Sequence, residues 1–309
     1  MQLAAIVGPT GVGKTRVAVE VAEKLDAYII SCDSMQVYRG MDIGTAKASS
    51  LVRQRIPHYL LDVVEPGVNY TVADYQRDAQ QLIHQFNEWG KLPLLVGGTG
   101  LYYQAVVDDY NLVPMPSSQQ VRQELEAEAD KSLDSLYARL QRVDPAAARS
   151  IKPEDRKRII RALEVYRLTG KPFSQFQTRN PHRYHLAAVG LYMERQALYR
   201  QIEARVDRMI EAGLVEEVER LYRQGYGLDN NSMQALGYKQ MFNYLQGIKT
   251  LPEVVEDIKR ETRRFAKRQM TWFRRDKRIH WFNVEQHRPE DLVERICIWI
   301  SRSLEILIE

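Results

Sequence analysis

The sequence predicts an α/β fold, in which a parallel β-sheet core is interrupted by a helical insertion. Short apolar runs alternate with helical periods over the first hundred residues, which is typical of βαβ units. From about residue 114 to 186 helical periods continue without a convincing strand. The chain has 309 residues, of which 44% are hydrophobic and 27% charged, and this excludes a disordered tail or a disulfide-stapled miniprotein.

The elements of the core follow from the apolar pattern. Leu3–Val7 is a continuous apolar run and predicts a buried strand, and apolar residues four apart (Val17, Val21 and Leu25) predict the helix after it. Further strands are predicted at Ala27–Cys32, Leu60–Val64 and Leu92–Val96. Ligands of open parallel sheets bind outside the carboxyl ends of the strands, so the turns after these strands should converge on one crevice.

Three segments make up the expected domain organisation: 1–113 is the first part of the core, 114–186 the helical insertion, and 187–309 the second part of the core with basic C-terminal helices. Residues 114–118 (Pro-Met-Pro-Ser-Ser) are a plausible linker. The alternating pattern at His185–Tyr192 predicts that the chain returns to the sheet. A late strand is predicted at Arg278–Val284, and a final helix near Asp291 to Leu307.

Basic residues are concentrated in two windows. Residues 259–278 hold ten Lys/Arg against two acids, and residues 149–161 hold six against two. These windows contribute +8 and +4, which leaves −8 for the rest of a chain whose formal charge is +4. The clustering indicates a phosphate-bearing partner that meets two surfaces, although two solvated helix faces would give the same pattern.

Several classes of protein are excluded. The two cysteines, Cys32 and Cys297, have no partner at metal-ligand spacing, so neither a zinc site nor a disulfide framework is expected. No apolar run approaches the roughly 18–20 residues of a membrane helix, and no basic leader precedes the first strand. We therefore expect a cytoplasmic protein without membrane contact, and take a monomer as the default.

A phosphate-binding loop follows the first strand. Residues Gly8, Pro9, Thr10, Gly11, Val12, Gly13, Lys14 and Thr15 match GxxxxGK[ST] between a predicted strand and a predicted helix. Backbone N–H groups of such a loop surround phosphate oxygens, the lysine neutralises the outer phosphate, and the Thr15 hydroxyl is a ligand for Mg²⁺. The fold class is thus an α/β P-loop parallel-sheet core, and the ligand contains linked phosphates.

The motifs of P-loop ATPases and GTPases are otherwise incomplete. Leu92–Val96 ends in glycines rather than in a metal-binding Asp, and no Asn-Lys-x-Asp occurs. Asp62 lies inside the run Leu60–Val64 and not at its end. The sequence therefore gives weak support for an ATPase or GTPase that couples nucleotide hydrolysis to motion.

Asp33 follows the second strand, in the polar segment Ser31–Lys47, which has no helical period. If the first two strands are neighbours, Asp33 lies near the phosphate loop and is a candidate general base. Aspartate is also favoured in turns and at helix N-termini for purely local reasons. The residues alone leave both interpretations open.

Taken together, the motifs closely resemble the bacterial tRNA dimethylallyltransferases over nearly the whole chain. The similarity lies in the phosphate loop, Asp33-Ser34 through Gly44-Thr45-Ala46-Lys47, Leu94 to Tyr102, Arg161 to Val165, Gly237 to Gln240 and Lys267 to Arg274. One departure is Ala48, where the family pattern leads us to expect proline.

The resemblance implies an activity: transfer of a dimethylallyl group from its diphosphate to N6 of the adenosine at position 37, next to the anticodon of tRNA. It implies that the phosphate loop holds a diphosphate leaving group with Mg²⁺, and that Thr10 and Lys14 take part in catalysis. Asp33 would be the base and would also recognise the amine. Arg205 is a further candidate for diphosphate binding.

The partner implied by the resemblance is the anticodon stem-loop, clamped by the insertion. The expected tRNA-binding residues are Asp33, Ser34, Met35, Gln36, Thr99, Arg122, Lys157, Arg158, Arg161, Gln234, Gly237, Lys239, Lys267, Arg268, Trp272 and Arg274. For Trp272, base stacking and a place in the core are equally plausible. The alternatives are a P-loop kinase using ATP with the insertion as a lid, a prenyltransferase acting on free adenine nucleotides, and a noncatalytic RNA-binding module.

Overall fold

The computed structural model describes residues 1–112, 118–176 and 178–306. It divides into two compact units, one formed by Met1–Val107 with His182–Glu309 and the other by Asp108–Pro181. The helical unit therefore starts at Asp108 and ends at Pro181, a few residues before each end of the expected range 114–186. The expected boundary at residues 113 and 114, and most of the expected linker, lie outside the described residues.

A six-stranded sheet forms the centre of the first unit, and all of its strand pairs are parallel. The strands are β1 (Gln2–Val7), β2 (Ala27–Cys32), β3 (His58–Tyr59), β4 (Leu92–Gly97), β5 (His185–Tyr192) and β6 (Ile279–Asn283). Their order is β3-β2-β4-β1-β5-β6. The return of the chain to the sheet through β5 and the late strand β6 are confirmed.

One expected strand is wrong. The segment Leu60–Val64 turns instead of extending, since Leu60 and Asp62 have φ values of 59° and 55°. The Asp62 carboxylate is paired with Lys47 at 2.6 Å and with Arg53 at 2.8 Å. Asp62 is thus part of an ion-pair cluster that ties two loops together.

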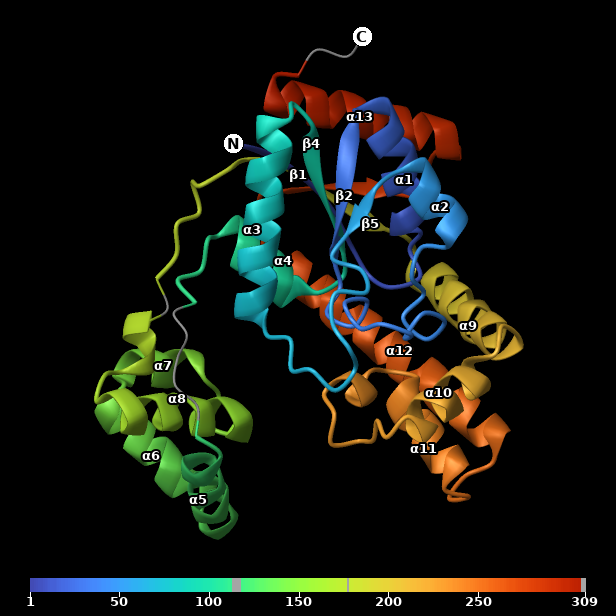
Figure 1. Cartoon of the computed structure of the whole chain (residues 1–309). Coiled ribbons are helices and arrows are strands. Elements are labelled where there is room, and N and C mark those ends of the chain that lie inside the picture. The colour runs from blue at the N-terminus through green and yellow to red at the C-terminus, as the bar shows by residue number, and fades with distance from the viewer. Residues whose placement is uncertain (113–117, 177, 307–309) are drawn as a thin grey trace. The chain divides into compact units, whose positions relative to one another are not determined.

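Helices cover both faces of the sheet (Figure 1). Those of the first unit are α1 (Lys14–Lys24), α2 (Ser50–Arg55), α3 (Val72–Glu88), α4 (Gly100–Val107), α9 (Arg195–Glu211), α10 (Leu214–Arg223), α11 (Tyr238–Leu245), α12 (Leu251–Phe273) and α13 (Pro289–Leu304). The final helix ends at Leu304, before the expected limit, and Leu307 lies outside the described residues. No helix in the described part of the chain has the length and apolar character needed to cross a membrane.

Alternate residues of each strand enter different cores, because successive side chains of a strand point to opposite faces. Ala4 and Ile6 of β1 pack with α1 and α13, whereas Leu3, Ala5 and Val7 pack with α3 and α4. Both faces are buried, so β1 appears in the sequence as one continuous apolar run.

A third core cluster lies beyond the carboxyl ends of the strands. It joins α10, α11 and the first half of α12 to the segment that follows β2, through residues such as Val37, Tyr38 and Met41. This cluster holds a long irregular segment of the chain in place, although residues 33–49, all of them described, contain no helix or strand.

The second unit is helical, as expected. It contains α5 (Gln119–Lys131), α6 (Leu133–Val143), α7 (Pro145–Ser150) and α8 (Arg156–Thr169), with a short 3₁₀ helix at Phe173–Phe176. Leu125, Leu140, Ile159 and Leu163 form the centre of its own buried cluster. A separate core is consistent with a compact unit inserted into the sheet domain.

Candidate active site

The ends of three adjacent strands, β2, β4 and β1, meet at one crevice. β1 and β2 are not neighbours, since β4 lies between them. The backbone N–H of Thr99, after β4, donates to the carbonyl of Cys32 at 3.1 Å, and the Thr99 hydroxyl accepts from the N–H of Ser34 at 3.0 Å. The predicted convergence of the turns is confirmed, with β4 as the element that joins them.

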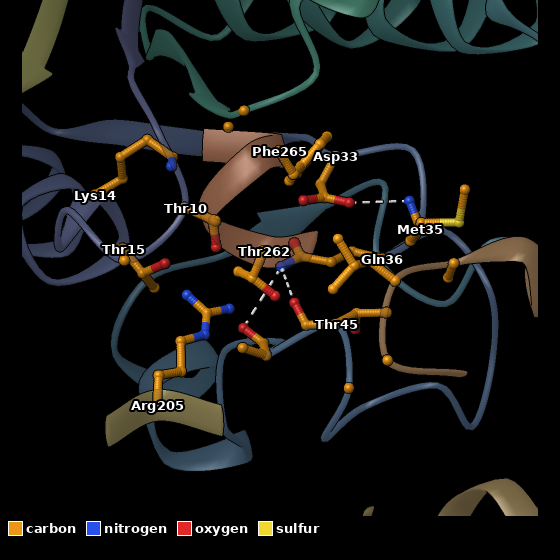
Figure 2. Close-up of a pocket in the computed structure, with 18 of the residues that line it drawn as sticks. Thr10, Lys14, Thr15, Asp33, Met35, Gln36, Thr45, Arg205, Thr262 and Phe265 are labelled. Carbon is orange, nitrogen blue, oxygen red and sulfur yellow. Dashed lines mark hydrogen bonds between the residues drawn. The ribbon is translucent and has the colours of Figure 1, made fainter. Parts of the chain in front are cut away.

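A cavity of about 960 Å³ opens at this edge of the sheet. Many predicted site residues line it: Thr10, Gly11, Gly13, Lys14, Thr15, Asp33, Ser34, Met35, Gln36, Thr99, Arg205, Gln234, Gly237, Lys239 and Arg268. Gly8, Pro9 and Val12 of the phosphate loop do not line it, and Val12 is buried in the core under α1. Figure 2 shows the side chains of Thr10, Asp33 and Arg205 pointing into the same space.

The phosphate loop has the backbone conformation that its glycines allow. Gly13, directly before α1, has a φ of 91°, a conformation that a residue with a side chain rarely adopts. The Lys14 ammonium donates to the carbonyls of Gly8 and Pro9, at 2.9 and 2.8 Å. Burial, and then the nearby guanidinium of Arg205, lower the pKa of Lys14 to about 7.

Arg205 reaches the cavity from α9 (Figure 2). Burial lowers its pKa from the ordinary value, and the charge of Asp33 partly opposes this shift. In the described parts of the chain no carboxylate forms an ion pair with Lys14 or Arg205. Two basic side chains thus face one cavity without a paired anion, and a polyanionic ligand would favour the charged form of Lys14.

Asp33 makes the local turn contact that one of the two interpretations predicts, and its role as a general base stays a prediction. Its Oδ1 accepts a hydrogen bond from the backbone N–H of Met35 at 2.9 Å, which is the local turn contact (Figure 2). No hydrogen bond to its other oxygen is found among the described residues. The carboxylate is therefore oriented by the turn and still has an acceptor facing the cavity.

Sequence reasoning missed the role of Gln269, on the buried side of α12. Its side-chain oxygen accepts the backbone N–H of Thr10 at 2.8 Å, and its nitrogen donates to the carbonyl of Gly98 at 2.9 Å. The sequence does contain a signal for this role. Thr262 and Gln269 are polar residues in the otherwise apolar stripe of α12 that includes Ile258, Ala266 and Phe273. Polar side chains at buried positions generally need a hydrogen-bond partner.

The basic window 259–278 is less charged toward solvent than its composition indicates. Half of its ten cations pair with carboxylates: Lys259 with Asp207, Arg260 with Asp257, Arg263 with Glu203, Arg264 with Glu261, and Arg278 with Asp276. Lys267, Arg268 and Arg274 are exposed, and no ion pair to them occurs within the described ranges. The remaining charge lies in the second half of α12 and just after it.

Trp272 does not line the cavity. Its indole is half-buried at the edge of the core under α3 and α4, and it packs so closely on Gly100 that a Cβ there would lie 2.3 Å from the ring. Its buried ring N–H has no hydrogen-bond partner among the described residues. A contact with tRNA through Trp272 stays a prediction.

The predicted tRNA-binding residues of the insertion fall into two groups, one paired with a buried carboxylate and one exposed. Arg122 on α5 and Arg161 on α8 both bind the buried carboxylate of Glu164, at 3.0 and 2.7 Å. Burial raises the pKa of Glu164, but the hydrogen bonds from Arg161 and Arg122 outweigh it and lower the net value. Lys157 and Arg158, by contrast, are exposed.

Comparison with known proteins places the chain in a family. The family model described as IPP transferase matches residues 36–276, a range that includes Arg205 and Gln269. A tRNA dimethylallyltransferase of Syntrophomonas wolfei is 53% identical over 308 residues, which cover 99% of each chain. This chain belongs to the tRNA dimethylallyltransferase family.

Solved structures of the family share the fold. The crystal structure of the tRNA isopentenylpyrophosphate transferase of Bacillus halodurans is 44% identical, with a TM-score of 0.76 over 98% of this chain and 97% of that one. A eukaryotic dimethylallyltransferase acting on tRNA is 27% identical, with a TM-score of 0.76 over 91% of this chain and 73% of that one. The P-loop sheet with a helical insertion is therefore the fold of this dimethylallyltransferase family.

Proposed function

We propose that this protein transfers the dimethylallyl group of dimethylallyl diphosphate to N6 of adenosine 37 in tRNA. The observation that carries the proposal is the cavity in which two basic side chains without a paired anion, Lys14 and Arg205, face the carboxylate of Asp33. In a chain of this family, the cations suit a diphosphate and the carboxylate suits an amine that must lose a proton.

Leaving-group stabilisation is the first task of the site. As the allylic C–O bond breaks, negative charge grows on the diphosphate oxygens, so fixed donors around them stabilise the transition state more than the ground state. Lys14, Arg205 and the hydroxyl of Thr10 are among the donors that line the cavity. Gln269 holds the backbone of Thr10 and thereby fixes this end of the phosphate loop.

The donor set fits Mg²⁺ if the metal is bound together with the diphosphate. No cluster of three His, Cys, Asp or Glu side chains that would hold a metal alone occurs in the described residues. Mg²⁺ commonly binds through one or two protein oxygens plus substrate phosphates, and the Thr15 hydroxyl lines the cavity. When bound, the ion would neutralise charge on the departing diphosphate.

Proton removal is the second task. The exocyclic amine of adenosine is a poor nucleophile and releases a proton as the new C–N bond forms, which gives the acceptor oxygen of Asp33 its role. The base must leave the stacked anticodon loop to enter a cavity at a sheet edge. Ser34, Met35, Gln36 and Thr99 lie around Asp33 and would surround the base.

Binding of the remaining tRNA is assigned to surfaces on both units. Gln234, Gly237 and Lys239 line the cavity, and Lys267, Arg268 and Arg274 continue from it along α12. On the insertion, Lys157 and Arg158 supply exposed charge, while Arg122 and Arg161 are oriented by Glu164. Cations at fixed positions suit the phosphates of a folded RNA loop.

Incubation with labelled dimethylallyl diphosphate, Mg²⁺ and unmodified tRNA tests the proposal. We expect the label on adenosine 37, and no label in a tRNA that carries guanosine there. Parallel reactions with free adenosine monophosphate and with ATP separate a free-nucleotide prenyltransferase and a kinase from the tRNA enzyme. Absence of transfer to any adenosine-containing anticodon loop would refute the proposal.

A further inference from the structure

Glu217 on α10 is a buried carboxylate that binds the backbone of a distant loop. The residue is 2% exposed. Its Oε2 accepts the N–H groups of Asp42 and Ile43, both at 2.9 Å, and its Oε1 accepts the N–H of Gly44 at 3.1 Å. Three successive peptide groups thus close around one carboxylate, as they do around a bound anion.

Tyr238, the first residue of α11, completes this contact. It is fully buried, and its hydroxyl donates to Oε1 of Glu217. Its ring lies against Gly44, where a Cβ would come within 2.4 Å of the ring, so only glycine fits at that position. Glu217 therefore joins α10 to both the 42–44 loop and the start of α11.

Burial of the Glu217 carboxylate costs free energy that a purely structural contact between apolar side chains would not. A buried carboxylate loses its hydration, and within the described parts of the chain no Lys or Arg forms an ion pair with Glu217. Hydrogen bonds from the 42–44 N–H groups and from the Tyr238 hydroxyl offset this loss of hydration. The same bonds fix the positions of those groups. The surrounding cluster is otherwise apolar, with Leu214, Val218 and Met241, and an apolar residue would avoid the cost of burying a charge there.

The 42–44 loop leads directly into the wall of the cavity. The next two residues, Thr45 and Ala46, accept hydrogen bonds through their carbonyl oxygens from the side-chain nitrogen of Gln36, at 3.1 and 3.5 Å. The oxygen of the Gln36 amide accepts from the Ser31 hydroxyl at 2.9 Å. Gln36 is thereby held in one orientation beside Asp33 (Figure 2).

The other side of the same contact also reaches the cavity. Gly237 and Lys239, on either side of Tyr238, both line it. Two walls that are far apart in the sequence, 44–46 and 237–239, are therefore fixed to one carboxylate. Among the described residues, the hydrogen bonds of the Glu217 carboxylate go to the 42–44 backbone, which ends at the first wall, and to Tyr238 in the second, and not to the phosphate loop.

We propose that Glu217 is a positioning residue for tRNA, which sets the two cavity walls that receive the adenosine and leaves diphosphate binding to the phosphate loop. The inference rests on the proposed function, because it assigns the wall near Gln36 to the tRNA substrate. It predicts that changes at Glu217 alter tRNA affinity and catalysis, and do so separately from the affinity for dimethylallyl diphosphate.

The test compares Glu217→Gln with Glu216→Gln, which removes the same charge at the neighbouring position of α10. In Glu217→Gln, the new amide would offer an N–H₂ group where backbone N–H groups need an acceptor. A second variant, Tyr238→Phe, keeps the ring under Gly44 and removes only the hydroxyl. Each full-length variant is assayed for its dissociation constant with an anticodon stem-loop, its affinity for dimethylallyl diphosphate, kcat and KM for each substrate, and thermal unfolding.

We expect Glu217→Gln to weaken stem-loop binding about tenfold and to lower kcat/KM for tRNA by a similar factor, with diphosphate affinity within about twofold of wild type. Tyr238→Phe should give a smaller loss in the same direction, and Glu216→Gln none. Unchanged stem-loop affinity in Glu217→Gln, or equal losses for both substrates, would overturn the inference. If Glu217→Gln does not fold, the stem-loop affinity of Tyr238→Phe decides in the same way.

Failure of the proposed function gives a different result. If wild-type protein transfers no dimethylallyl group, the function is wrong whatever the variants do. The stem-loop dissociation constants then still decide the positioning role, because they need no turnover. Wild-type protein that neither transfers the group nor binds the stem-loop would overturn both.

Discussion

The side chain of Gln269 accepts a hydrogen bond from the backbone N–H of Thr10 at 2.8 Å, across 259 residues of sequence. The same amide donates to the carbonyl of Gly98. The helix that carries the exposed Lys267 and Arg268 therefore also holds the phosphate loop, so one rigid element contacts both parts of the site.

Replacing Gln269 tests this link. Gln269→Ala leaves the Thr10 N–H and the Gly98 carbonyl without their partner, at a cost of about 1–3 kcal/mol for each buried group. We expect the affinity for dimethylallyl diphosphate to fall about tenfold or more, measured by titration calorimetry. Gln269→Glu keeps the acceptor for Thr10 but places a carboxylate oxygen against the Gly98 carbonyl, so it should not restore the affinity. Equal diphosphate affinity in Gln269→Ala and wild type would contradict the link.

Asp33→Asn removes the base while keeping an oxygen that can accept from Met35. Turnover should fall about 10²–10⁴-fold, because general-base catalysis contributes that much, whereas dimethylallyl diphosphate should still bind. Asp26→Asn is the matched control, since Asp26 is exposed and pairs with Lys91. Single-turnover transfer rates give the measurement, and an unchanged rate in Asp33→Asn would remove Asp33 from the mechanism.

Charge reversal on α12 separates tRNA from small substrates. Lys267→Glu combined with Arg268→Glu should weaken tRNA binding and flatten its dependence on salt, because fewer counterions are released from the RNA. A reaction with free adenine nucleotides should change less, because of the two residues only Arg268 lines the cavity. Arg295→Glu with Arg302→Glu on α13 gives the same change in net charge at exposed positions away from the cavity. The same salt dependence in both double variants would argue against a specific role for α12.

Glu164→Gln tests how the insertion orients its arginines. Loss of the charged hydrogen bonds to Arg122 and Arg161 should destabilise the helical unit by about 2 kcal/mol at pH 7. The lowered pKa of Glu164 means that its contribution is present above the ordinary value of 4.5 and is lost as pH falls through the lower folded value. The difference from wild type should therefore shrink in acid.

Hydrogen exchange of the α5 and α8 amides, followed from about pH 7 down to the lowest pH at which the protein remains folded, measures this difference. Glu154→Gln serves as the control, since Glu154 is an exposed acid of the same unit. A difference between Glu164→Gln and wild type that stays constant with pH would show that the Glu164 charge does not contribute.

Local pattern was enough to predict the strands β1, β2, β4, β5 and β6, the phosphate loop and the helical character of the insertion. Each of these depends on residues close together in the sequence: an apolar run, a glycine spacing or a helical period. The position of Asp33 at the cavity was predicted for the same reason, because it directly follows a strand, and its role as a base stays a prediction. The monomeric state and the cytoplasmic location stay predictions.

Long-range contacts account for what the sequence could not reveal. Gln269 and Glu217 act on loops about 170 or more residues away, so their partners follow only from the folded chain. Leu60–Val64 is apolar enough for a strand, yet the ion pairs of Asp62 with Lys47 and Arg53 favour a turn. The basic window seemed stronger than it is partly because two of its carboxylate partners, Glu203 and Asp207, lie on another helix.

The pairing of β1 with β5 also has a consequence for biosynthesis. Gln2 lies opposite His185 in the sheet, and its side-chain nitrogen donates to the carbonyl of Leu304 at 2.9 Å. A nascent chain therefore exposes one edge of its first strand until the whole helical unit has left the ribosome. The insertion can complete its own core earlier, whereas the sheet depends on segments made last, which favours slow closure of the sheet.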